Sequence, residues 1–113
     1  MAKDDYFIVM YKILAYLYQC LKDGVKPNID KAKEVVGINK VYWNAVICDC
    51  IENGYIRTPI KFMNLEDCRD ISVTSKGIEY LEENSHLQKA KNFLGAAFET
   101  TLKVAVQATK AIG

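Results

Sequence analysis

The residue types in this chain that most often carry chemistry are its four cysteines and its only histidine: Cys20, Cys48, Cys50, Cys68 and His86. A structural zinc site needs about four Cys or His ligands at short spacings such as Cys-x-x-Cys. The sequence has no such pair, and Cys48 and Cys50, two residues apart on a predicted helix, point to different sides. We therefore expect reduced thiols that act as small hydrophobic side chains, with no metal ion and no cofactor.

Groups for acid-base or nucleophilic catalysis are equally sparse. A Cys-His pair would have to use His86, which we expect to be a solvated residue in the first turn of a helix. The acidic residues are scattered, and the sequence has neither a glycine-rich phosphate loop nor a Walker lysine. We therefore expect a protein that is not an enzyme, with no catalytic residues.

The composition is that of one globular domain. The chain has 113 residues, of which 50% are hydrophobic and 26% charged, and its net charge is +1. Such a balanced chain is no polycation, so bulk charge cannot drive binding to nucleic acid.

The acidic Asp4 and Asp5, followed by Lys12, do not resemble a signal peptide, and the uncharged run 13–21 is too short to span a bilayer. We expect a cytoplasmic protein without membrane association.

The elements that must position any functional residue can be predicted from periodicity and capping. Apolar residues at helical spacing predict a first helix over 4–23, stopped by Gly24. Asp30 is a candidate N-cap for a short helix that ends near Val36. Asn39 is a candidate N-cap for a third helix that runs to Asn53.

Strand patterns follow in the second half of the chain. Residues 55–73 predict a two-stranded hairpin, in which a proline favours an edge strand. Thr74 is expected to cap a short helix through Asn84. Ser85 and Gln88 then form a capping box that starts a last helix, which can run to Ile112.

This order predicts an α+β, mainly α, winged helix: a helix-turn-helix followed by a β wing. We expect a winged-helix domain over residues 1–84 and a C-terminal amphipathic helix over residues 85–113, the latter a candidate dimerisation element.

Three segments resemble one protein family. The sequence Glu-Asn-Gly-Tyr-Ile at 52–56 resembles the entry to a wing, and Val-Thr-Ser-Lys-Gly-Ile-Glu-Tyr-Leu-Glu-Glu-Asn at 73–84 resembles the exit from it. Together with Tyr-Lys-Ile-Leu at 11–14, these segments make the chain similar to the YjcQ family. The resemblance covers residues 4 to about 94. The resemblance implies a small winged-helix-like protein of bacteria and their phages, with a suggested link to prophages and no catalytic residues.

The predicted third helix is the candidate for contact with DNA. Its apolar side, expected to pack inward, carries Trp43, Val46, Ile47, Cys50 and Ile51. On its outer side, Lys40 and Asn44 could reach a phosphate or a base edge, asparagine being suited to adenine.

Other basic residues could add to this face, although acidic residues oppose them. Lys31 and Lys33 precede the third helix, and Lys61 and Arg69 lie in the wing. Asp49 and Glu52 are expected on the outer side of the third helix, and Glu66, Asp67 and Asp70 lie in the wing. Residues 1–83 hold eleven basic and thirteen acidic residues, a balance of −2, whereas residues 84–113 hold four and one, a balance of +3. Any binding to double-stranded DNA is thus expected to be weak and sensitive to salt.

The C-terminal helix has one apolar stripe, made of Leu87, Leu94, Phe98, Ala105 and Ile112. An unbroken helix here would be about 40 Å long, whereas its domain should be about 30 Å across. The stripe could pair with a second copy in a homodimer, which we favour. It could instead fold back with Gly95 as a bend, or lie on a membrane, for which its alanines and threonines are poorly suited.

Two functions follow as hypotheses. The first is a DNA-binding dimer, encoded by a phage or prophage as a regulator. The second is a non-enzymatic protein-protein interaction module on the same scaffold, used in phage assembly or host takeover. The fold's usual role favours the first hypothesis, and the thin positive charge favours the second.

Overall fold

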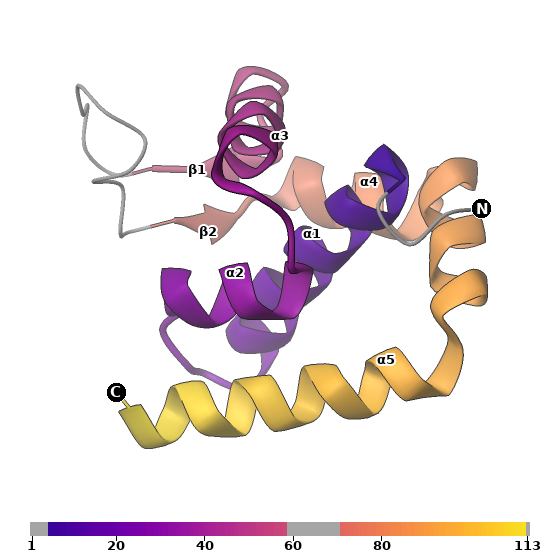
Figure 1. Cartoon of the computed structure of the whole chain (residues 1–113). Helices are drawn as coiled ribbons and strands as arrows, with labels where there is room; N and C mark the ends of the chain where they lie inside the picture. The colour runs from indigo at the N-terminus through magenta and orange to yellow at the C-terminus, as the bar shows by residue number, and fades with distance from the viewer. Residues whose placement is uncertain (1–4, 59–70, 113) are drawn as a thin grey trace.

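A computed structural model describes residues 5–58 and 71–112. Within these ranges the fold is mainly helical, with one small two-stranded antiparallel sheet, in the order α1, α2, α3, β1, β2, α4 and α5. This order agrees with the predicted one (Figure 1).

Helix α1 (Tyr6–Lys22) is the centre of the fold. Asp5 caps it, accepting a hydrogen bond from the backbone N–H of Phe7, and Gly24 follows it with a φ of 68°. Most of its residues from Ile8 to Cys20 are buried, on nearly all sides, because α2, α4, α5 and β2 pack around it. Only a few positions of α1, such as Lys12 and Gln19, are polar, and a helix with so wide an apolar surface needs neighbouring elements to cover it.

Helices α2 (Ile29–Val36) and α3 (Lys40–Glu52) follow, joined by a short turn. The predicted N-cap of α2 is wrong by two residues: Asn28, rather than Asp30, accepts the bond from the backbone N–H of Lys31. Gly37 ends α2 in the left-handed conformation, with a φ of 68°, and Asn39 caps α3 as predicted.

Strands β1 (Ile56–Arg57) and β2 (Ser72–Val73) pair with Ile56 opposite Val73. Both of these side chains are buried, and Arg57 is exposed. The wing residues predicted to meet DNA, Lys61 and Arg69, lie outside the described residues.

Helix α4 (Ser75–Glu83) begins at its predicted cap, Thr74. The predicted capping box of Ser85 and Gln88 is wrong. Asn84 accepts hydrogen bonds from the first backbone N–H groups of α5, and the Gln88 side chain donates back to the carbonyl of Leu81 at 2.9 Å. Gln88 thereby ties α5 to α4.

Helix α5 (Ser85–Ile112) is not the straight rod that we expected. Gly95, with φ 66° and ψ −160°, breaks it into a first arm (85–94) and a second arm (96–112), and the second arm turns back along the molecule (Figure 1). The molecule is thus only 35 Å in its longest dimension. The sequence left several alternatives open for this helix, and the structure shows the one in which the helix folds back at Gly95.

The apolar stripe of α5 is accordingly covered by its own chain. Leu87, Phe98 and Ala105 are buried, Leu94 is half-buried, and the side chain of Ile112 lies outside the described residues. In this conformation Leu87, Phe98 and Ala105 pack within one chain, since the bend brings the second arm onto α1, and the expected dimer interface stays a prediction. Buried residues of both arms of α5, among them Leu87 and Val106, belong to the same core cluster as those of α1.

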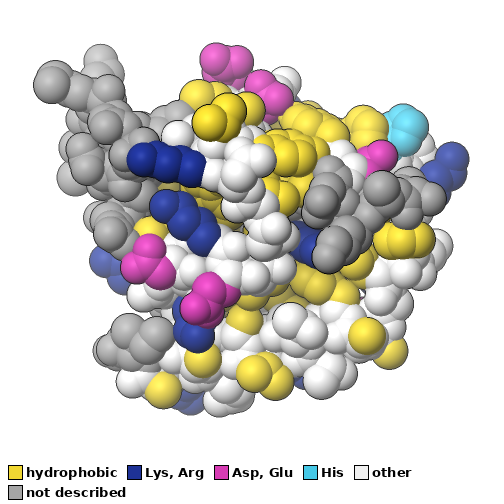
Figure 2. Space-filling model, in the orientation of Figure 1, with side chains coloured by type: hydrophobic (Ala, Val, Ile, Leu, Met, Phe, Trp, Pro, Cys, Tyr) yellow, Lys and Arg dark blue, Asp and Glu magenta, His cyan; other side chains and the backbone are white. Residues whose placement is uncertain are grey.

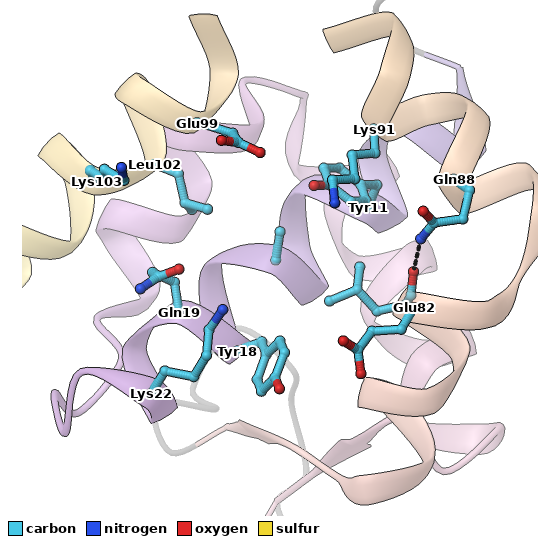
Figure 3. A pocket seen from close by; sticks show the side chains of 12 residues that line it. Tyr11, Tyr18, Gln19, Lys22, Glu82, Gln88, Lys91, Glu99, Leu102 and Lys103 are labelled. Atoms are coloured by element: carbon cyan, nitrogen blue, oxygen red, sulfur yellow. Dashed lines mark hydrogen bonds between the residues drawn. The ribbon is translucent and has the colours of Figure 1, made fainter. Parts of the chain in front are cut away.

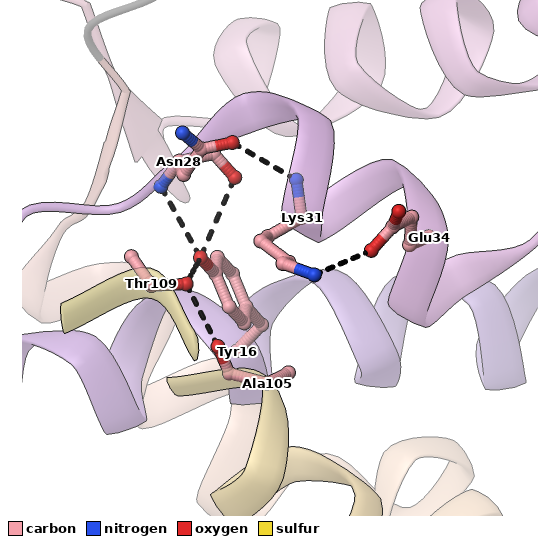
Figure 4. Close-up of polar contacts among 6 residues, drawn as sticks. All are labelled: Tyr16, Asn28, Lys31, Glu34, Ala105 and Thr109. Carbon is pink, nitrogen blue, oxygen red and sulfur yellow. Dashed lines mark hydrogen bonds and ion pairs between the residues drawn. The ribbon is translucent and has the colours of Figure 1, made fainter. Parts of the chain in front are cut away.

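One buried polar contact fixes the second arm (Figure 4). The Tyr16 hydroxyl of α1 lies 2.6 Å from Thr109 Oγ1, and it also accepts a hydrogen bond from the backbone N–H of Asn28 at 3.2 Å. Thr109 donates in turn to the carbonyl of Ala105. The Tyr16 hydroxyl therefore joins α1, α2 and α5, and its partners satisfy the hydrogen bonding that burial demands.

Candidate nucleic-acid interface

Helix α3 is held by an apolar inner face. Trp43, Val46, Ile47 and Cys50 are buried in the core, and Ile51 packs against it, as the helical periodicity predicted. Burial in apolar surroundings raises the pKa of the Cys50 thiol to about 12, so this thiol stays protonated and unreactive. The inner face thus fixes which side of α3 is turned outward.

The first turn of α3 projects from the molecule. Val41 is 80% exposed, Lys40 and Ala45 are also exposed, and Asn44 is half-buried. Helix α3 packs on β1 and α1, and it lies at the opposite side of the molecule from the second arm of α5 (Figure 1). A projecting first turn is the geometry with which a recognition helix enters a groove.

The outer carboxylates of α3 are placed differently from our expectation. Asp49 is half-buried and accepts a hydrogen bond from the Tyr6 hydroxyl of α1 at 2.7 Å. Burial and this bond raise the pKa of Tyr6 well above its usual range. Asp49 is thus directed toward α1 rather than outward, whereas Glu52, at the far end of α3, is exposed. Glu52 is therefore the one carboxylate of α3 that is exposed on its outer side.

The two lysines of α2 are both engaged. Lys31 Nζ lies 2.9 Å from a carboxylate oxygen of Glu34, an ion pair drawn in Figure 4. Lys33 Nζ lies 6.0 Å from the centre of the Trp43 ring, at the outer limit of a cation–π contact. Lys31 therefore offers a phosphate less positive charge than the sequence implied.

Two basic residues near the sheet were missed as candidate site residues. Arg57 is exposed on β1, and Lys76, exposed in the first turn of α4, lies 5.8 Å from the centre of the Tyr55 ring. Alternation along 55–57 could have marked Arg57 as outward. Lys76 gave no comparable signal, because only the tertiary fold brings α4 beside Tyr55.

Charges of both signs are interspersed on the surface. On the face that Figure 2 shows, Lys and Arg side chains lie close to Asp and Glu side chains, and its coloured atoms show no continuous basic area. Hydrophobic side chains gather in the upper part of this face, where Figure 1 places α3 and α4. Electrostatic attraction to DNA would therefore depend on a few separate cations.

Among the residues considered for metal binding or catalysis, Cys68 lies outside the described part of the chain, and the others are dispersed. Cys20 and Cys50 are buried, Cys48 is half-buried, and the exposed His86 ring stacks on Phe7 with 4.4 Å between centres. Within residues 5–58 and 71–112, no three His, Cys, Asp or Glu side chains group as metal ligands. No helix in this part of the chain has the length and hydropathy needed to cross a membrane.

Comparison with known proteins identifies a family and no individual relative. No curated protein matches the chain, and no solved structure matches it. The sequence model of one family, described as YjcQ protein, matches residues 11–99. This range covers most of the chain, including α2 through α4 and the bend at Gly95. The chain therefore belongs to the YjcQ family.

Proposed function

We propose that this chain is a small winged-helix DNA-binding protein in which the first turn of α3 enters the major groove. The order α2, short turn, α3, β1, β2 is that of a helix-turn-helix followed by a wing. The observation that carries the proposal is the projecting first turn of α3, where Lys40, Val41 and Asn44 lie together while Asp49 is turned toward Tyr6.

Each side chain of this turn has a role that fits its chemistry. Asn44 would donate to and accept from an adenine edge, and Val41 would contact a thymine methyl group. Lys40 would contact a phosphate, which fixes the protein on the duplex without reading sequence. Further phosphate contacts would come from Lys31, Lys33, Lys61 and Arg69. A protein with these contacts would serve as a regulator of phage or prophage genes.

The expected affinity is low. Glu34 neutralises Lys31, and the net charge is only +1. Few phosphates would be neutralised, so binding should be weak, and because these contacts are electrostatic the affinity should fall as the salt concentration rises. Removing one lysine that binds a phosphate should lower the slope of this dependence by about 1.

Fluorescence anisotropy of a labelled mixed-sequence duplex, titrated at two salt concentrations, tests the proposal. The full chain should bind at low salt and lose affinity at the higher concentration. Lys40→Glu should weaken binding about tenfold or more, because it replaces an attraction to phosphate by a repulsion. The control is Lys110→Glu, which makes the same charge change in the exposed last turn of α5. Absence of binding at low salt, or equal effects of both variants, would refute the proposal.

A second candidate is a non-enzymatic protein-protein interaction module. It is favoured by the 80% exposure of Val41, since an exposed apolar side chain suits a protein partner, and by the ion pair of Lys31 with Glu34, which reduces the positive charge that α2 offers to DNA. Changing Lys40 and Lys61 to glutamate separates the candidates. The double change should abolish binding to DNA and leave a protein partner bound.

A further inference from the structure

A cavity of about 280 Å³ lies between α1, α4 and both arms of α5. Figure 3 shows it closely: Tyr11, Tyr18 and Lys22 come from α1, and Lys91 and Glu99 come from the two arms of α5. It lies apart from the projecting turn of α3, and the bend at Gly95 creates it by placing the second arm opposite α4.

The inner wall of the cavity is apolar and fixed by packing. Tyr11, Ala15, Leu81 and Leu102 line it, and all four are buried in the core. Gln88 fixes the wall between α4 and α5 through its bond to the Leu81 carbonyl. An aromatic and aliphatic wall with a few polar groups at its edge is the usual make-up of a small-molecule site.

Charges of both signs surround the opening, and most of them lack partners. Lys91, Lys103, Glu82 and Glu99 are exposed, and none of the four has an ion pair or side-chain hydrogen bond with the described residues. Lys22 Nζ lies 4.5 Å from the centre of the Tyr18 ring. The opening therefore presents three cations and two carboxylates to a molecule in the cavity.

Figure 3 shows how these groups are directed. The ammonium groups of Lys22 and Lys91 and the carboxylate of Glu99 turn toward the space between the helices. Burial, together with the charge of Glu99, raises the pKa of the Tyr11 hydroxyl, so this hydroxyl remains a hydrogen-bond donor beside the apolar wall. A ligand with a single charge would gain from one set of groups and be repelled by the other.

We propose that this cavity binds a small zwitterion with an apolar side chain, a free α-amino acid. Its carboxylate would lie near Lys22 and Lys91, its ammonium near Glu99, and its side chain against Tyr11 and Leu102. Sites for drug-sized ligands have volumes of roughly 300–1,000 Å³. The volume of this cavity lies just below that range, which suits a ligand as small as an amino acid. The proposal does not depend on binding to DNA.

Ligand-observed NMR on the full chain tests the chemistry. The probes are L-leucine and L-phenylalanine at millimolar concentrations, with phenethylamine and 3-phenylpropanoate as analogues that lack the carboxylate or the ammonium. We expect saturable binding of at least one of the two amino acids, and affinities of both analogues about tenfold lower than that of phenylalanine, since each analogue lacks one of the two charged groups. Failure of both amino acids to bind, or equal binding of either analogue and phenylalanine, would overturn the proposal.

Two substitutions then locate the site. Lys91→Gln and Glu99→Gln change exposed side chains and should leave the fold intact, as circular dichroism can verify. Each should weaken binding of the amino acid about threefold or more. Lys110→Gln, on the same helix but outside the cavity, should leave the affinity unchanged. Equal affinity of the Lys91 and Glu99 variants and the unchanged chain would place the ligand elsewhere and overturn the proposal.

Discussion

Replacing Gly95 by alanine should convert the bent α5 into a straight helix. The φ of 66° and ψ of −160° lie in a region open essentially only to glycine, and a side chain there costs about 1–3 kcal/mol. A Cβ at this position would meet nothing within 4 Å, so the cost comes from the backbone alone. In a straight helix, by contrast, alanine is favoured over glycine by about 1 kcal/mol. The two effects together favour the straight form by about 3 kcal/mol, roughly two orders of magnitude in the equilibrium.

A straight α5 exposes a surface that needs a new partner. Phe98, Leu102 and Val106 would leave the core, and the hydrogen bond between Tyr16 and Thr109 would break. A second copy can restore all of these interactions by exchanging second arms, because the same residues then meet across two chains. We therefore expect Gly95→Ala to form an exchanged dimer.

Size-exclusion chromatography with light scattering would measure this directly, over a range of protein concentrations. The control is Gly24→Ala, since Gly24 also has a φ of 68° and open space at its Cβ, but no helix continues through it. That variant should lose stability and keep the oligomeric state of the unchanged chain. If Gly95→Ala shows both the mass and the melting temperature of the unchanged chain, the assignment of the bend to Gly95 is refuted.

Three further changes test the packing by thermal and urea unfolding. Gly77→Ala should lower the free energy of unfolding by about 2 kcal/mol and the melting temperature by roughly 10 °C, although alanine has the higher helix propensity. The reason is that the added Cβ would lie 2.2 Å from the Tyr55 carbonyl oxygen. An unchanged melting temperature would contradict this close approach. Tyr16→Phe should cost about 1–2 kcal/mol, since the Asn28 N–H loses its buried partner, and a neutral result would show that water replaces the hydroxyl. Burial raises the pKa of the Cys50 thiol to about 12 in the folded state, whereas its pKa in the unfolded state is about 8.5. The thiol therefore makes its full contribution to the free energy of unfolding below the unfolded pKa, and this contribution falls by up to about 1.4 kcal/mol per pH unit at higher pH. Cys50→Ala should therefore reduce the loss of stability between about pH 9 and 10, and an equal slope would refute the assignment.

Local sequence determined most of the helices and the inner face of α3. The caps at Asn39 and Thr74 were predicted because a side chain that bonds the backbone three residues later depends on neighbouring residues alone. Trp43 and Val46 were placed inward by helical periodicity, which is also a local property. The family resemblance followed from contiguous segments, and the family match over residues 11–99 confirms it.

The tertiary structure decided which partner each surface meets. The apolar stripe of α5 was predicted from periodicity, which shows only that a face must be covered, and the bend at Gly95 places Phe98 of this stripe beside Tyr11 of α1 in the same chain. Asp49 was expected to face outward, yet it bonds Tyr6, which is 43 residues away in the sequence. The cavity likewise draws on α1, α4 and both arms of α5. Such arrangements depend on how helices pack around α1, and a helical wheel has no information about a neighbour that is distant in sequence.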